Sequence, residues 1–97
     1  MANIDEELAL ASEARAAIEK RPKEMFKVLR TAALVARTQQ TLKFSSEAAL
    51  NKARRRVGSA LESLIPALEV HRETPTRMDK AKVTIDEWIK EIKAARP

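Results

Sequence analysis

The chain has 97 residues, the length of one small domain, and carries 19 Lys and Arg against 14 Asp and Glu, a net charge of +5. Hydrophobic residues make up 44% of it, too large a share for a disordered chain, while one Gly and four Pro are too few for a turn-rich β fold. The absence of cysteine excludes a disulfide framework, a thiol nucleophile and a Cys-based zinc site. We therefore expect residues 1–97 to form a single helical domain.

The first predicted helix runs from about Ile4 to Lys20. Asn3 is a suitable N-terminal cap, and acidic residues in the first turn with Lys20 in the last suit the helix dipole. Its apolar stripe consists of Ile4, Leu8, Ala11 and Ile18. This spacing predicts one face turned toward a core.

The second predicted helix follows Pro22, because proline is tolerated where a helix begins, and extends to about Gln40. Its broad apolar face consists of Met25, Phe26, Leu29, Ala32, Ala33 and Ala36. Several of these side chains are small, so a neighbouring helix is expected to approach this face closely.

The third predicted helix begins within residues 44–47, where Ser45 or Ser46 can cap it, and extends to about Glu73. Its stripe consists of Leu50, Val57, Leu61, Leu64 and Leu68. Pro66 lacks a backbone donor and presses on the carbonyl of Glu62, so a kink or a restart of the helix is expected near residues 64–66.

The fourth predicted helix follows the connector 74–76, with Thr76 and Asp79 placed as in a capping box, and extends to Arg96. Its apolar side carries Met78, Ala81, Ile85, Trp88, Ile89 and Ile92. Short connections favour antiparallel neighbours. The sequence therefore predicts an all-α fold, a small antiparallel bundle of about four helices. The alternative is a long hairpin that completes its core by dimerising.

Basic residues are the strongest functional signal. They lie opposite the apolar face of the second helix and in a cluster on the third, where Arg54 belongs to the run. The candidate contacts for nucleic acid or an acidic partner are Lys23, Lys27, Arg30, Arg37, Lys52, Arg55 and Arg56. Glutamates dilute this charge, and the alternative interpretation is a solvated face.

A helix-turn-helix motif is a second way to use the same segments. The third helix would then read bases from its N-terminal part, where Asn51 and Arg54 are suitable residues. Both helices are long for this motif and the turn lacks glycine, so the match is poor.

Apolar residues away from the stripes suggest a protein interface. The off-stripe candidates are Leu10, Leu34 and Val83, and Trp88 on the apolar side of the fourth helix is a further interface candidate. Trp88 is interpreted either as an anchor at the core edge with its indole N–H at the surface, or as an interface hot spot. Several such positions on a small helical protein favour self-association or docking with another protein.

The sequence shows no recognisable arrangement of catalytic, metal-binding or phosphate-binding residues. His71 lacks a second metal ligand at an established spacing, and Asp86 and Glu87 point to different faces of a helix. Gly58 falls inside a helix, where it favours close packing rather than a phosphate loop. We expect no catalytic residue, cofactor or metal site.

The location expected from the sequence is the cytoplasm of a bacterium, or of a cell making a phage product. The N-terminal residues are acidic and lack the apolar region of a signal peptide, and no apolar run has the length of a membrane span. The expected function is a non-enzymatic protein-interaction module that acts as an accessory, regulator or inhibitor and self-associates. The alternative is a nucleic-acid-binding protein that uses the basic face.

Overall fold

A computed structural model of the chain describes residues 4–21, 23–39, 48–71 and 75–95, with the side chains of all but 39, 68–71 and 75–77. These residues form four α-helices and no strand. The helices are α1 (Ile4–Lys20), α2 (Met25–Gln39), α3 (Ala48–His71) and α4 (Pro75–Ala95). They pack against one another, which confirms the predicted small helical bundle.

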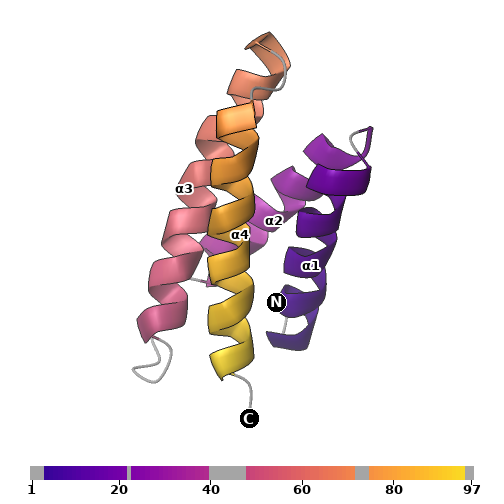
Figure 1. Cartoon of the computed structure of the whole chain (residues 1–97). Helices are drawn as coiled ribbons and strands as arrows, with labels where there is room; N and C mark the ends of the chain where they lie inside the picture. The colour runs from indigo at the N-terminus through magenta and orange to yellow at the C-terminus, as the bar shows by residue number, and fades with distance from the viewer. Residues whose placement is uncertain (1–3, 22, 40–47, 72–74, 96–97) are drawn as a thin grey trace.

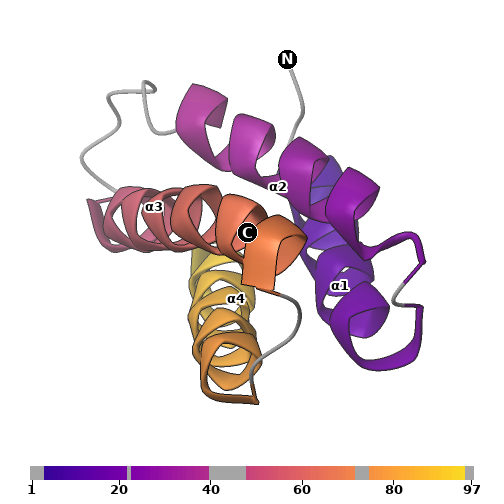
Figure 2. The ribbon, with the colours of Figure 1, turned by 90° about the horizontal axis from the view of Figure 1, so that it is seen from above.

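The helices form a closed ring in chain order. α1 contacts α2, α2 contacts α3, α3 contacts α4, and α4 returns to α1 (Figure 2). α3 and α4 lie side by side and run in opposite directions, and α1 runs opposite to α4, whereas α2 crosses the others obliquely (Figure 1). Therefore α1 and α3 are diagonal partners, and so are α2 and α4.

The helix ends lie close to the predicted ones. α1 has the predicted limits, and α4 begins at Pro75 rather than after Thr76, because the first turn does not need the donor that proline lacks. The expected caps and connector (Asn3, Ser45, Ser46 and Thr74) lie outside the described residues. The described part of α3 begins at Ala48, and its predicted start within residues 44–47 lies outside the described residues.

α3 continues through Pro66 as one helix, so it does not restart there. Pro66 and Glu62 are both exposed. The carbonyl of Glu62, which loses its donor to the proline, therefore lies on the outer side of the helix, where water can hydrogen-bond to it. The long third helix tolerates the proline for this reason.

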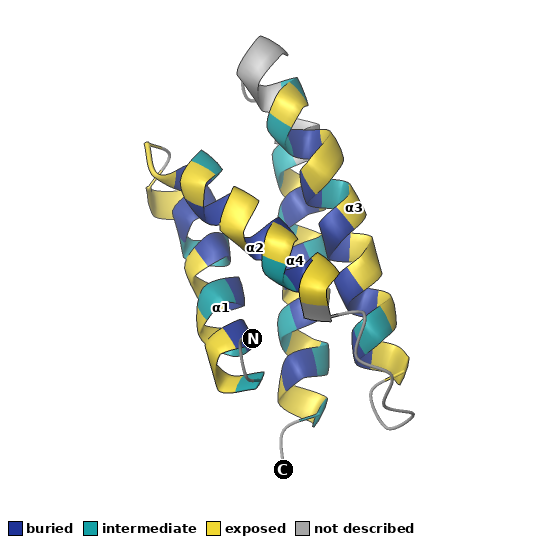
Figure 3. Cartoon of the chain, turned by 180° about the vertical axis from the view of Figure 1, so that it is seen from behind, coloured by how far each residue is buried: buried dark blue, intermediate teal, exposed yellow. Residues whose placement is uncertain are grey.

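One core fills the ring, and every helix contributes to it. The buried hydrophobic residues are Ala11, Ala14, Ala17, Ile18, Met25, Val28, Leu29, Ala32, Ala33, Ala36, Leu50, Ala53, Val57, Leu61, Leu64, Ala81, Ile85, Trp88 and Ile92. They face inward in Figure 3. The predicted stripes of α2, α3 and α4 supply most of them, while the side chains of Leu68 and His71 lie outside the described residues.

The stripe of α1 differs from the predicted one. Ile4 and Leu8 are only partly buried, and the fully buried face is centred on Glu7, Ala11 and Ala14. The helix is therefore rotated so that a carboxylate, not a leucine, points into the centre of the bundle. The reason is the polar cluster that receives this carboxylate.

Candidate functional site

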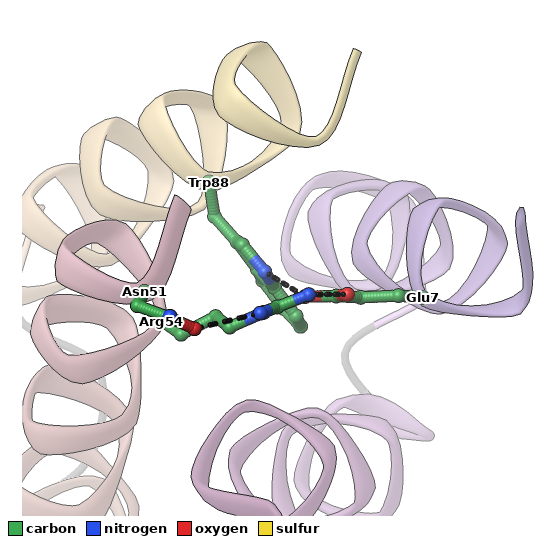
Figure 4. Close-up of polar contacts among 4 residues, drawn as sticks. All are labelled: Glu7, Asn51, Arg54 and Trp88. Carbon is green, nitrogen blue, oxygen red and sulfur yellow. Dashed lines mark hydrogen bonds and ion pairs between the residues drawn. The ribbon is translucent and has the colours of Figure 1, made fainter. Parts of the chain in front are cut away.

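An ion pair at the centre of the bundle joins the diagonal helices α1 and α3. Glu7 is completely buried and Arg54 is 2% exposed. Arg54 Nε donates to Glu7 Oε2 at 2.8 Å, and Arg54 Nη2 donates to Glu7 Oε1 at 2.7 Å (Figure 4). This is the two-point geometry that a planar guanidinium forms best with a carboxylate.

Two further side chains complete this polar cluster. The indole Nε1 of Trp88, on α4, donates to Glu7 Oε2 at 2.7 Å, and Arg54 Nη1 donates to Asn51 Oδ1 at 2.8 Å (Figure 4). Trp88 is completely buried, so its indole N–H is not at the surface and the side chain offers no area to a partner. The interpretation as a core-edge anchor with an exposed N–H was wrong, because Glu7 supplies an internal acceptor.

The buried cluster sets the rotation of α3 and α4 about their axes. Consecutive residues of a helix point about 100° apart. Since Arg54 points into the core, Arg55 and Arg56 must point outward, and both are exposed. Burying Trp88 likewise places the preceding Glu87 outside. Arg56 Nη1 lies 3.5 Å from Glu87 Oε1, which ties the two helices at that level.

A groove of about 680 Å³ lies on the outer side of the α3–α4 pair. The helices lining it supply cationic, hydroxyl and apolar groups. Its lining residues are Arg55, Arg56, Ser59, Ala60, Ser63, Leu64, Lys80, Ala81, Thr84 and Glu87. Small side chains at Ala60 and Ala81 leave the space between the helices open. The Thr84 hydroxyl donates to the carbonyl of Lys80 at 2.7 Å.

The charge of the groove is positive at both ends. Glu87 is the single carboxylate among the described residues of its lining, and Arg56 pairs with it. Among the described residues, Arg55 and Lys80 have no ion pair. The groove is therefore an amphipathic hollow with an apolar floor and uncompensated positive charge.

A smaller hollow lies on the other side of α3, between α2 and α3. It has a volume of about 230 Å³ and shares Arg55 and Ser59 with the groove. Arg37 and Glu62 line it, and their side chains form an ion pair of 2.9 Å. Its floor is Gly58, where an added Cβ would lie 3.6 Å from Arg37 Cγ. This is an ordinary contact distance, so the packing of α2 against α3 does not require the glycine for which the sequence indicated close packing.

The seven predicted basic residues do not form one patch. All are exposed. Arg55 and Arg56 lie on α3, and Arg37, near the C-terminal end of α2, lies beside α3, whereas Lys27 and Arg30 lie toward the N-terminal end of α2. Lys27 and Arg37 are about 15 Å apart along the helix axis, at 1.5 Å per residue. Arg37 and Arg56 pair with glutamates, and Arg30 lies 5.9 Å from the ring centre of Phe26.

The structure contradicts the helix-turn-helix interpretation at two positions. Arg54 is buried in the bond with Glu7, and Asn51 accepts from Arg54. Arg54 is therefore not available to a DNA groove, and the partly buried Asn51 is engaged by Arg54. Arg54 therefore does not belong to the exposed basic cluster. The serines that would open the recognition helix lie outside the described residues.

The off-stripe apolar residues are not brought together either. Leu34 on α2 is 63% exposed and Val83 on α4 is 64% exposed, and these two helices are diagonal in the ring. Leu10 is partly buried and packs against the core. Val83 is not in the lining of the groove, but it lies three residues after Lys80 and four before Glu87, which are, so it borders the groove on α4.

A peripheral ion pair network joins α1 to α4. Arg15 Nη1 lies 2.7 Å from Glu19 Oε1, and Arg15 Nε lies 2.9 Å from Asp86 Oδ1. Burial acts to lower the pKa of Arg15, but hydrogen bonds to Glu19 and Asp86 outweigh it and raise that pKa. The hydrogen bond from Arg15 lowers the pKa of the Glu19 carboxyl.

Neither a metal-binding cluster nor a membrane-spanning helix is found among the described residues. The described residues contain no group of three or more His, Asp or Glu side chains placed to hold a metal ion. Within the same part of the chain, none of the helices combines the length and the apolar character needed to cross a bilayer.

Comparison of the chain with protein-family models, with curated proteins and with solved structures gave no match. The surface features of the chain itself are therefore the basis on which a function is proposed.

Proposed function

We propose that the chain is a non-enzymatic protein-interaction module that binds a partner in the groove between α3 and α4. The single observation that carries this proposal is the groove itself. It combines an apolar floor, hydroxyl groups and cations along two adjacent helices. Helix pairs of this kind bind an amphipathic segment by burying its apolar face between them.

The contacts that hold the helices of the groove together support the same proposal. The polar cluster around Glu7 joins α1, α3 and α4 from inside, and the Arg56–Glu87 pair joins α3 to α4 at the surface. A binding surface carried on fixed helices loses little conformational entropy when a partner docks. The chain is therefore suited to present a preformed groove.

Nucleic-acid binding is the second candidate. Lys52 and Arg55 are exposed on α3, and neither has an ion pair within the described part of the chain. These two charges are available to phosphates. Glutamates accompany Arg37 and Arg56, however, and would be brought close to any phosphate bound there. The same glutamates would repel an acidic protein as well, so the apolar floor of the groove, which a phosphate backbone would leave uncovered, is what favours the protein-interaction proposal.

One premise of the predicted self-association, a core that needs a second copy to be covered, does not hold in the structure. The described core residues Leu61, Ile85 and Trp88 are fully buried within a single chain. The core therefore does not need a second copy to be covered. Dimerisation stays a prediction, and light scattering coupled to size exclusion measures it directly.

Selection from a library of displayed random peptides tests the proposed function. The bait is the wild-type protein, and the counter-bait is Ser63→Trp, which fills the groove from an exposed position. Ser12→Trp, at an exposed position on α1 outside the groove, is the matched control. Circular dichroism of all three proteins checks that the helices are retained.

The expected result is a set of peptides that bind the wild type and Ser12→Trp but not Ser63→Trp. Failure to enrich any peptide, or equal binding to Ser63→Trp, would contradict the proposal. Binding of a nucleic-acid duplex that Ser63→Trp leaves intact, without any enriched peptide, would favour the second candidate.

A further inference from the structure

We infer that the α3–α4 groove selects an acidic amphipathic helix with two carboxylates spaced seven residues apart. This inference rests on the proposed function and names the chemistry of the partner. The positions of the cations, the apolar floor and the balance of charge support it.

The cations lie at the two ends of the groove. Arg56 contacts Glu87, so these residues mark one level of the antiparallel pair. Lys80 precedes Glu87 by seven residues, so it lies about 10.5 Å farther along α4, at a rise of 1.5 Å per residue. Arg55 and Arg56 therefore mark one end of the groove and Lys80 the other.

A helical ligand matches this spacing with residues i and i+7. These two positions lie on the same face of a helix and are also about 10.5 Å apart along its axis. A carboxylate at one position would reach Arg55 and Arg56, and a carboxylate at the other would reach Lys80. Seven residues is the spacing that lets two acidic side chains on one face reach both ends.

The apolar floor between the cations determines which side chains the middle of the ligand should carry. Ala60, Leu64 and Ala81 line the groove there, and Val83 lies next to it with 64% of its surface exposed. On the ligand, positions i+3 and i+4 fall between the two acids on the same face. Large apolar side chains at these positions would fill the space left by the two alanines and cover Val83.

The charge balance favours an acidic protein segment over a basic or neutral one. Among the described residues, three cations line the groove against one carboxylate, and that carboxylate is already paired with Arg56. Arg55 and Lys80 would gain partners from the ligand. A cationic helix would instead be repelled at both ends.

Fluorescence anisotropy with synthetic peptides tests this inference. The acidic peptide has an Ala/Gln background of about 18 residues, long enough to populate a helix, with Glu at i and i+7 and Leu at i+3 and i+4. A neutral peptide replaces both Glu by Gln. A third peptide carries both Glu on the face opposite the leucines.

Protein variants then assign the charges. Arg55→Glu and Lys80→Glu should each weaken binding of the acidic peptide by about fivefold, the upper range for an exposed ion pair. Lys93→Glu, an exposed position on α4 outside the groove, is the control of equal charge change and should leave binding unaltered. A peptide with Lys at i and i+7 should bind the Arg55→Glu/Lys80→Glu protein more tightly than it binds the wild type.

The outcomes separate the two proposals. Three results together support the inference. The acidic peptide binds preferentially to the wild type, both charge reversals weaken that binding, and the lysine peptide binds the doubly reversed protein more tightly than it binds the wild type. Equal binding of the neutral or face-swapped peptide would overturn the acidic spacing while the interaction module stands. No binding of any synthetic peptide, when the library yields groove-dependent ones, would also overturn it. A nucleic-acid duplex that displaces the acidic peptide and is weakened by the same reversals would assign the groove to phosphates instead.

Discussion

Glu7 and Arg54 form a two-point ion pair in the centre of the bundle, with N–O distances of 2.7 and 2.8 Å, between helices that are diagonal in the ring. The indole of Trp88 donates to the same carboxylate, so three helices meet at one side chain. A buried charge without its partner is strongly unfavourable. The pair therefore specifies which faces of α1 and α3 turn inward.

Arg54→Met should lower the free energy of unfolding by about 3–5 kcal/mol, because it leaves the Glu7 carboxylate buried without its cation. Arg55→Met, at the exposed neighbouring position, should change it by less than about 0.5 kcal/mol. Urea denaturation measures both values. Equal stabilities of the two variants would show that Arg54 is not buried as described.

The double variant Glu7→Met/Arg54→Met should be more stable than Arg54→Met alone. Removing both charges eliminates the desolvation cost that one unpaired charge would carry. The coupling between the two positions should be at least about 1 kcal/mol. Additive losses in this double-mutant cycle would contradict a direct pair.

Leu61→Ala should cost about 2–5 kcal/mol, the range for truncating a leucine in a packed core, because Leu61 is fully buried. Lys52→Ala, an exposed position on the same helix, should cost less than about 0.5 kcal/mol. Thermal melts followed by circular dichroism compare the two. Similar melting temperatures would mean that the inner face of α3 is assigned incorrectly.

Gly58→Ala should stabilise the protein by about 0.5–1 kcal/mol, because alanine is the better helix former. The new Cβ would lie 3.6 Å from Arg37 Cγ and 4.0 Å from Ala36 Cβ, which are ordinary contact distances. A loss of stability in chemical denaturation would show that α2 and α3 pack more closely than described.

The Arg15–Glu19 pair should add stability at neutral pH that disappears in acid. The folded-state pKa of Glu19 is lowered by its hydrogen bond from Arg15. The contribution is therefore present above the ordinary pKa of a glutamate and is lost as the pH falls through the lowered value. Glu19→Gln should flatten the acid side of the stability curve. An unchanged curve for Glu19→Gln would exclude this pair as a source of stability.

The helices and most of the core could be predicted from the sequence, because apolar spacing and helix-end residues act locally. The stripes through Leu29, Leu61 and Ile85 are buried as predicted. The angle at which α2 crosses the bundle could not be predicted. It depends on how the small residues of its apolar face pack against the other helices, which no local pattern encodes.

The buried ion pair was missed, although a signal for it was present. Arg54 lies four residues after Leu50 and three before Val57, and so falls on the apolar stripe of α3. Glu7 precedes Ala11 by four residues and falls on the buried face of α1. A positive and a negative residue, each on a buried stripe, predict a pair across the core. Both Glu7 and Arg54 lie beside exposed residues of the same charge, so the charge pattern alone places them with the surface residues.

The groove could be predicted only in part. Arg55 and Arg56 were expected to face solvent, because consecutive residues cannot all point inward. The contributions of Lys80 and Thr84 depend on the antiparallel register of α3 and α4, which the Arg56–Glu87 contact shows. The basic residues of α2 predicted a binding surface on a different face of the bundle.

The most direct measurement of the central claim is the map of amide chemical-shift changes when the acidic peptide, or a peptide from the library, is added to ¹⁵N-labelled protein. Binding in the groove predicts the largest changes at residues 55–64 of α3 and 80–87 of α4. Amides around Lys27 and Leu34 on α2 should change little. The largest changes on α2, with none in the groove, would contradict the proposal that the α3–α4 groove binds the partner.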